Sequence, residues 1–241
     1  MNYAILIPAR YESTRLPGKP LIKIAGKAMI QRTWERCCQA VSSEKVYVAT
    51  DNLEIKKAVL GFGGQVVMTS SSCLTGTDRL AEANKILDFD FIINVQGDEP
   101  IINPEDIKVV IEAYKKQPET VVNAMAPIKN KEEFFSLTVP KVVFDEEKNL
   151  LYMSRSPIPG SKDAKFNFGY KQVCIYAFSK MHLEYFCRTS KKTLFEEVED
   201  IEILRFLEGG VKVRMIEVQG GSIAVDVPND VLKVESFLAQ G

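Results

Sequence analysis

Three cations follow the first apolar run of the chain within ten residues. Arg10, Arg15 and Lys19 lie in segment 8–20, which reads PARYESTRLPGKP. In an open α/β sheet, ligands bind beyond the carboxyl ends of strands, and clustered cations suit the oxygens of a polyphosphate. The segment predicts a polyphosphate-binding loop, although a solvated basic loop has the same composition. It matches neither the P-loop nor the dinucleotide glycine pattern, which weighs against a P-loop NTPase and a nicotinamide oxidoreductase.

Two aspartates stand where later apolar runs end. Asp98 lies in segment 94–100, which reads NVQGDEP, and Asp226 lies in segment 224–228, which reads AVDVP. A carboxylate at the end of a buried strand can hold a divalent cation, and Mg²⁺ is typically bound by one or two carboxylates together with phosphate oxygens. We predict that Asp98 and Asp226 bind one Mg²⁺. Each aspartate could instead serve as a turn or helix-capping residue.

A polar turn in segment 74–79, LTGTDR, leads into a predicted helix. The first amides of a helix can receive an anion or the polar edge of a ring, so this turn is a further candidate ligand contact. His182 is the single histidine and lies in a helical stretch away from these segments. We predict a structural or surface role for it, which leaves Ser/His and Cys/His catalysis unsupported.

Short apolar runs alternate with helical periodicity through the first half of the chain. This alternation predicts an α/β fold with a parallel, doubly wound sheet. It breaks at about residues 120–176, where strands and a hairpin predict a small β-rich lobe inserted into a single domain spanning 1–241. We expect strands at 3–8, 45–50, 65–68, 91–95, 121–125, 141–144, 150–154, 171–178 and 211–218, and helices at 29–40, 53–61, 77–87, 104–117, 195–207 and from 228 onward.

The composition is that of a globular protein. The chain has 241 residues, 46% of them hydrophobic and 26% charged, with a net charge of −1. The lack of a basic excess argues against nucleic acid as a partner, and no apolar run approaches the ~20 residues of a membrane span. Five cysteines without a C-x-x-C pair predict neither a disulfide framework nor a zinc site, and with no signal peptide at the start they favour a reducing cytoplasm.

Taken together, the motifs resemble those of the 3-deoxy-manno-octulosonate (Kdo) cytidylyltransferases, the CMP-Kdo synthetases. The matching segments span nearly the whole chain: 8–20, 48–51 (VATD), 76–79 (GTDR), 94–100, 154–155 with 158–159, and 225–228. The resemblance implies a three-layer α/β/α fold of the nucleotide-diphospho-sugar transferase type, with a mostly parallel sheet. It also implies CTP and Mg²⁺ as ligands, a homodimer formed partly through the inserted lobe, and a sugar product for lipopolysaccharide or capsule synthesis.

The resemblance also implies roles for particular residues. Arg15, Lys19, Asp98 and Asp226 would be catalytic, with Arg15 and Lys19 on the triphosphate and the two aspartates on Mg²⁺. The cytidine would be surrounded by Ala9, Arg10, Thr75 and Gly76, and the sugar pocket would be lined by Arg79, Gln96, Arg155, Gln172, Tyr176 and Glu202. Arg79 or Arg155 could clamp the carboxylate of the sugar, because a planar guanidinium can bind it with two hydrogen bonds.

Two positions depart from the family pattern. Gln172 stands where the family typically has a histidine, and Ile203 stands where it commonly has a glutamine. An unmatched hydrogen-bonding group at a polyhydroxylated ligand costs about 1–3 kcal/mol, enough to change sugar preference. Another ulosonic acid, such as the 8-amino analogue of Kdo or a nonulosonic acid, is therefore an alternative acceptor. A non-catalytic nucleotide-binding protein is a further alternative, which pyrophosphate release would distinguish.

Overall fold

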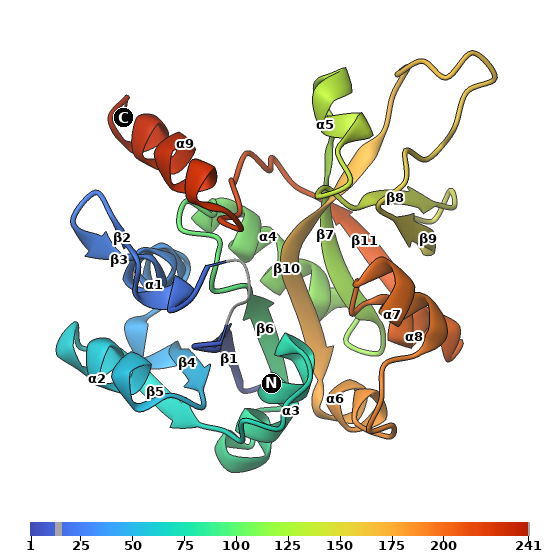
Figure 1. Ribbon diagram of the computed structural model, residues 1–241. Helices are drawn as coiled ribbons and strands as arrows, with labels where there is room; N and C mark the ends of the chain where they lie inside the picture. Colours follow the sequence, from blue (N-terminus) through green and yellow to red (C-terminus); the bar gives the residue numbers. More distant parts are fainter. Residues whose placement is uncertain (13–15, 241) are drawn as a thin grey trace.

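A mostly parallel sheet forms the centre of the protein (Figure 1). The computed structural model describes residues 1–12 and 16–240. Within these ranges nine strands form one sheet, whose main path has the order β11-β7-β10-β6-β1-β4-β5, with the β8–β9 hairpin attached through β10. The strands are β1 Tyr3–Ala9, β4 Val46–Thr50, β5 Gln65–Met68, β6 Phe91–Val95, β7 Val121–Pro127, β8 Lys141–Phe144, β9 Leu150–Ser154, β10 Tyr170–Ser179 and β11 Val213–Glu217.

The direction of the strands brings the candidate ligand loops together. β1 pairs in parallel with β4 and β6, so the chain leaves all three strands at the same edge of the sheet. β10 is antiparallel to both β6 and β7, which makes the sheet mixed rather than wholly parallel. The predicted α/β class with a mostly parallel sheet is confirmed.

Helices cover both faces of the sheet and create two apolar cores. One face packs against α1, α2 and α4 through residues such as Ile30, Val59 and Ile111, and the other packs against α3, α6 and α8 through Leu80, Phe186 and Phe206. The helices are α1 Met29–Ala40, α2 Leu53–Gly61, α3 Gly76–Leu87, α4 Pro104–Lys116, α5 Lys131–Phe135, α6 Lys180–Phe186, α7 Leu194–Glu199, α8 Leu204–Glu208 and α9 Pro228–Leu238.

Side-chain caps explain where several helices begin. The Asn52 side chain accepts from the amides of Glu54 and Ile55 at the start of α2. Asn103 does the same for α4, whose first residue is Pro104. Proline is favoured there because the first helical N–H has no intrahelical partner. These capped starts fix the direction in which each helix leaves its loop.

Four segments differ clearly from the sequence expectations. The predicted helix at 195–207 is two short helices, because Asp200 between them adopts a left-handed conformation with φ of 52°. A small hairpin, β2 Lys23–Ile24 with β3 Lys27–Ala28, and the helix α5 were not predicted. Residues 211–212 and 218, predicted as strand, flank the shorter β11.

The β-rich region is more integrated than an inserted lobe. β7 and β10 lie within the main sheet, where β10 pairs with β6 and β7 pairs with β11. The part that extends away from the body consists of the β8–β9 hairpin, α5 and the loop before β10, at the upper right of Figure 1. The segment 120–176, predicted as an inserted lobe, thus includes strands whose pairing partners β6 and β11 lie outside it.

His182 is a structural residue of α6. It is 6% exposed, and its Nδ1 accepts a hydrogen bond from the Ser179 amide while Ser179 Oγ accepts from the His182 amide. This reciprocal pair caps the helix. All five cysteines are free, and no helix in the described ranges is long and apolar enough to span a membrane.

Candidate active site

A cleft of about 290 Å³ lies at the carboxyl ends of β1 and β6. Its walls come from the loops after these strands, the start of α3, the turn between α7 and α8, and the segment before α9. Ten of the residues assigned to the site from sequence line it: Ala9, Arg10, Lys19, Thr75, Gly76, Arg79, Gln96, Asp98, Glu202 and Asp226. Arg15 lies outside the described residues.

Two carboxylates converge on one ammonium in this cleft. Lys19 Nζ lies 2.7 Å from Asp98 Oδ2 and 3.1 Å from Asp226 Oδ1. Burial lowers the pKa of Lys19, but the attraction and hydrogen bonds of the two carboxylates outweigh it and leave that pKa raised. The first predicted loop and both predicted aspartates therefore meet at one point.

Main-chain contacts hold the two aspartates together. The Val225 amide donates to the Asp98 carbonyl oxygen at 2.9 Å. Next to Asp98, Gly97 approaches β1 so closely that an added Cβ would lie 2.7 Å from the Pro8 carbonyl oxygen. A glycine is needed there because any side chain would push the Asp98 loop away from the first strand.

A buried acid supports the same region. Glu99 is 5% exposed and accepts a hydrogen bond from Ser222 Oγ, which ties the segment before Asp226 to the loop of Asp98. Burial, together with the nearby charge of Asp98, raises the pKa of Glu99 to about 7.

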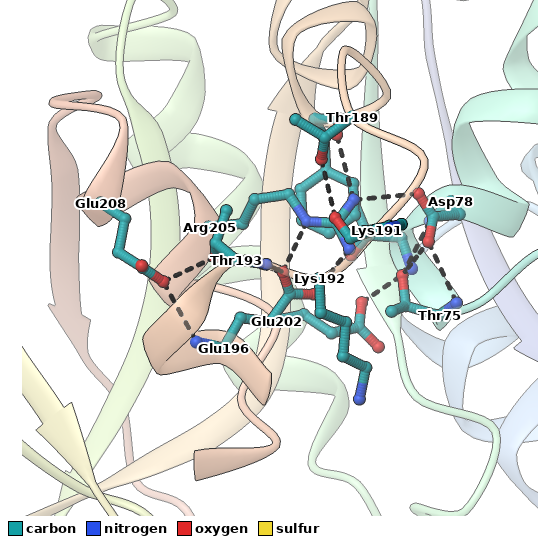
Figure 2. Close-up of polar contacts among 12 residues, drawn as sticks. Thr75, Asp78, Thr189, Lys191, Lys192, Thr193, Glu196, Glu202, Arg205 and Glu208 are labelled. Carbon is teal, nitrogen blue, oxygen red and sulfur yellow. Dashed lines mark hydrogen bonds and ion pairs between the residues drawn. The ribbon is translucent and has the colours of Figure 1, made fainter. Parts of the chain in front are cut away.

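The start of α3 is occupied by a side chain of the protein itself. Thr75 and Asp78 cap the helix reciprocally (Figure 2). The Gly76 and Thr77 amides donate to the Glu202 carboxylate at 3.0 and 2.8 Å. The sequence predicted that these amides receive an anion or a ring edge. The anion they hold in this structure is Glu202, which is thereby fixed in the wall of the cleft.

A buried ionic network joins the Glu202 turn to the α3 loop (Figure 2). Arg205 donates to both carboxylate oxygens of Glu196, at 2.6 and 2.7 Å, and to Asp78 at 3.2 Å. Glu196 is fully buried and Arg205 is 3% exposed. A bidentate ion pair such as that of Arg205 with Glu196 fixes the relative orientation of its two side chains. Arg205, which also bonds to Asp78, therefore holds the turn that carries Glu202 against the loop that carries Thr75. No sequence pattern had singled out Arg205 or Glu196.

The residues predicted to surround the sugar divide into two groups. Gln96, Arg79 and Glu202 line the cleft, but the Arg79 guanidinium is engaged with Asp51 at 3.0 Å and with Thr69 at 2.6 Å. The structure does not bring Arg155, Gln172 or Tyr176 to the cleft wall.

Each of these three side chains has another environment. Arg155 donates to the backbone carbonyls of Glu199, Leu137 and Asp200. Tyr176 is packed in the apolar core with its ring stacked on Phe178.

Gln172 donates to Asn123 Oδ1 at 3.0 Å and lines a neighbouring cavity of about 550 Å³. Asp226 lines both this cavity and the cleft. Ile203, the other departure, is 1% exposed within the apolar core.

Two charged residues of the cleft were missed by sequence reasoning. Lys192 and Asp200 line the cleft and form an ion pair in which Nζ lies 2.6 Å from Oδ1. Lys192 precedes α7, and Asp200 lies at the turn between α7 and α8. The sequence analysis placed Asp200 inside a continuous helix, so only the break in that helix reveals the pair.

The carboxylates of Asp98 and Asp226 suit an Mg²⁺ ion that is also bound by the phosphate oxygens of a ligand. In the part of the chain that is described, no group of three or more His, Cys, Asp or Glu side chains is arranged to hold a metal ion. Asp98 and Asp226, however, already share one positive charge at Lys19 Nζ. Two carboxylates completed by phosphate oxygens and water are a common Mg²⁺ environment, so these residues fit the ion.

The fold and the cleft together define a nucleotidyltransferase of the α/β class. The sequence profile of the cytidylyltransferase family matches residues 4–213, and the chain belongs to this family. Among solved structures, it is similar to a CMP:2-keto-3-deoxy-manno-octonic acid synthetase complexed with CTP, with a TM-score of 0.91 and 37% identity over 100% of this chain and 99% of the other.

Curated relatives are similar over their full lengths. An 8-amino-3,8-dideoxy-manno-octulosonate cytidylyltransferase of a Shewanella species is 43% identical, covering 100% of both chains. A 3-deoxy-manno-octulosonate cytidylyltransferase of Syntrophotalea carbinolica is 39% identical, covering 99% of both chains.

Proposed function

We propose that this protein transfers CMP from CTP to the anomeric oxygen of 3-deoxy-manno-octulosonate, forming CMP-Kdo and pyrophosphate. The observation that carries the proposal is the convergence of Lys19, Asp98 and Asp226 in a cleft that the α3 loop also lines. The full-length similarity to a Kdo cytidylyltransferase and to a CTP-bound CMP-Kdo synthetase supports both substrates.

The side chains of the cleft have distinct tasks in this reaction. The anomeric oxygen attacks the α-phosphorus in line and pyrophosphate leaves, so negative charge grows on the phosphate oxygens. Lys19 neutralises part of that charge, while Ala9, Arg10, Thr75 and Gly76 lie around the cytidine. Glu202, oriented by the Gly76 and Thr77 amides, accepts a hydrogen bond from an acceptor hydroxyl.

We also propose Mg²⁺ as the cofactor, held by Asp98 and Asp226. When bound, it would supply Lewis-acid neutralisation of the triphosphate charge. The support is that both carboxylates lie against Lys19 Nζ. Loss of activity with a chelator, and its return with Mg²⁺, would test the cofactor directly.

The 8-amino analogue of Kdo is the second candidate acceptor. The 43% identical relatives carry that name, and Gln172 lies in the cavity that adjoins the cleft at Asp226. The ratio of kcat/KM for the two acceptors separates the candidates, because it reports differential transition-state binding.

The deciding experiment is pyrophosphate release from CTP and Mg²⁺ with Kdo, its 8-amino analogue and N-acetylneuraminate. We expect the highest kcat/KM with Kdo. A preference of tenfold or so for the 8-amino analogue would establish the second candidate, and turnover with N-acetylneuraminate alone would refute both. If no pyrophosphate is released with any of the three acceptors, the non-catalytic nucleotide-binding alternative is favoured.

We further propose a cytoplasmic homodimer whose product enters lipopolysaccharide or capsule synthesis. The free cysteines support a reducing compartment. Exposed apolar side chains on β9 and α7, including Leu151 and Val198 at 58% and 76% exposure, support an interface in that region. Light scattering of the wild type and of Val198→Glu would test it, and an unchanged mass in the variant would place the interface elsewhere.

A further inference from the structure

The proposed acceptor carries a carboxylate, and two of the four cations that line the cleft, Lys19 and Arg79, are largely shielded against acidic side chains. Among the described residues, Arg10, Lys19, Arg79 and Lys192 supply the positive charge of the cleft wall. Arg79 is 3% exposed and bonded to Asp51, and Lys19 lies between two carboxylates. Arg155, the other arginine that the sequence favoured as a carboxylate clamp, donates to three backbone carbonyls instead.

Lys192 differs from Lys19 and Arg79 because more of its side chain is exposed. Its side chain is 29% exposed, and its partner Asp200 is 69% exposed. An ammonium has three N–H donors, so one bond to Asp200 at 2.6 Å leaves donors for a ligand. Lys192 extends from the segment before α7 on the side of the cleft where Glu202 lies (Figure 2).

Asp200 is held so that it can orient Lys192. Its backbone has a φ of 52°, and its carbonyl oxygen accepts a hydrogen bond from Arg155 at 3.1 Å. A left-handed conformation in a non-glycine residue persists only where its surroundings enforce it, and Arg155 is part of that enforcement. The hydrogen bond from Lys192 lowers the pKa of Asp200, and the charges of Arg155 and Arg10 act in the same direction. The Asp200 carboxylate therefore stays ionised and keeps Lys192 in place.

We propose that Lys192 binds the carboxylate of the acceptor sugar acid and that Asp200 is its positioning residue. The inference rests on the proposed cytidylyl transfer to an ulosonic acid and adds the side chain that recognises the carboxylate of that acceptor. Lys192 would then set the requirement for a carboxylate, while Glu202, two positions after Asp200, contacts hydroxyls of the same sugar. This assignment replaces Arg79 and Arg155 as the predicted clamp.

The test compares Kdo with its carboxamide, which removes the negative charge but keeps the shape. Loss of one charge-assisted contact is worth about 10- to 100-fold in affinity, so we expect the wild type to prefer the acid by about that factor in kcat/KM. In Lys192→Met this preference should fall to about twofold or less, while the KM for CTP stays within about twofold of wild type. Lys192→Arg should restore most of the preference, because the charge returns.

The matched control is Lys191→Met, which removes the neighbouring exposed lysine. It should keep the wild-type preference for the acid. Asp200→Asn should raise the KM for Kdo several-fold with little change for the carboxamide, since it affects the acceptor only through Lys192. Thermal melting of every variant checks that it is folded.

Three results would overturn the inference. The first is an unchanged preference for the acid in Lys192→Met, and the second is an equal loss in Lys191→Met. The third is loss of the preference in Arg10→Met instead, since Arg10 is the other accessible cation near Asp200.

Failure of the proposed function is recognised separately. A wild type that releases no pyrophosphate with any ulosonic acid would refute the transfer reaction. Calorimetric titration of Kdo and its carboxamide into the CTP-bound wild type and Lys192→Met then decides the Lys192 assignment on its own. A wild type that binds both acceptors equally, or neither, would overturn it.

Discussion

The Val225 amide donates a hydrogen bond to the Asp98 carbonyl oxygen at 2.9 Å. This contact joins two segments that are far apart in the chain and places Asp226, the next residue, opposite Asp98. Lys19 Nζ lies within 3.1 Å of both carboxylates as a result. The charged centre of the cleft is therefore built on main-chain geometry, which substitutions of its side chains should leave intact.

Asp98→Asn tests that centre. We expect kcat to fall by about 100-fold or more with Kdo and CTP, because one of the two carboxylates that converge in the cleft loses its charge. The melting temperature should change little, since the bond from the Val225 amide uses the Asp98 backbone. Asp163→Asn, in the exposed loop before β10, is the matched control. Near-normal pyrophosphate release in Asp98→Asn would remove this residue from the metal site.

Lys19→Met should reveal how the two carboxylates depend on a cation. The variant removes the ion pairs of Lys19 with Asp98 and Asp226 at partly buried positions, so we expect a loss of about 1–2 kcal/mol in the free energy of unfolding. Millimolar Mg²⁺ should recover much of this loss, because an ion that binds the native state stabilises it. Urea titrations with and without Mg²⁺ measure both effects.

The control for that experiment is Lys27→Met, which removes a surface ion pair with Glu35. It should cost less than about 1 kcal/mol and show no response to Mg²⁺ beyond that of the wild type. A Lys19→Met variant that Mg²⁺ does not stabilise would count against the ion site at Asp98 and Asp226.

His182, the single histidine, predicts how the stability of the protein depends on pH, and its own titration can be followed directly. Burial lowers its pKa below 6.5, and a nearby backbone hydrogen bond at Glu119 only partly opposes this. The unfolded chain therefore binds more protons below pH 6.5, so stability falls as the pH drops from 6.5 through the native pKa. The side-chain NMR signal of this one histidine should titrate below 6.5 in the native protein and near 6.5 in urea. A native midpoint above 6.5 would contradict the assignment of His182 as a buried, neutral cap.

Ile203 and Gln172, the two departures from the family pattern, should differ in whether their substitution affects stability or acceptor preference. Ile203→Gln places an amide in a core position that is 1% exposed and should cost about 2–3 kcal/mol, with no change in acceptor preference. Gln172→His alters a side chain at the cavity beside Asp226, so the ratio of kcat/KM for Kdo and its 8-amino analogue should shift while stability changes little. A shift caused by Ile203→Gln and not by Gln172→His would reverse this division.

Much of the fold followed from local patterns. The helix at 53–61 and the strands at 65–68 and 91–95 agree with the structure to the residue, because periodicity, an asparagine cap and turn residues all indicate the same boundaries. The helix expected at 195–207 failed because an uninterrupted polar and apolar pattern does not show that Asp200 is left-handed. That conformation is held by contacts from outside the segment, including the bond from Arg155.

The sequence by itself determined the class of fold and the short motifs that meet at the cleft, since both depend on residue type and spacing along the chain. Only the tertiary structure decided which charges are accessible. Arg79 and Arg155 suited an acceptor carboxylate on sequence grounds, yet their guanidinium groups are engaged by Asp51 and by backbone carbonyls. Lys192 has its place in the cleft because the segment before α7, distant in sequence from the first loop, folds against the same cleft. Which charged side chains pair with one another depends on which residues are neighbours in space, and the folded structure alone determines that.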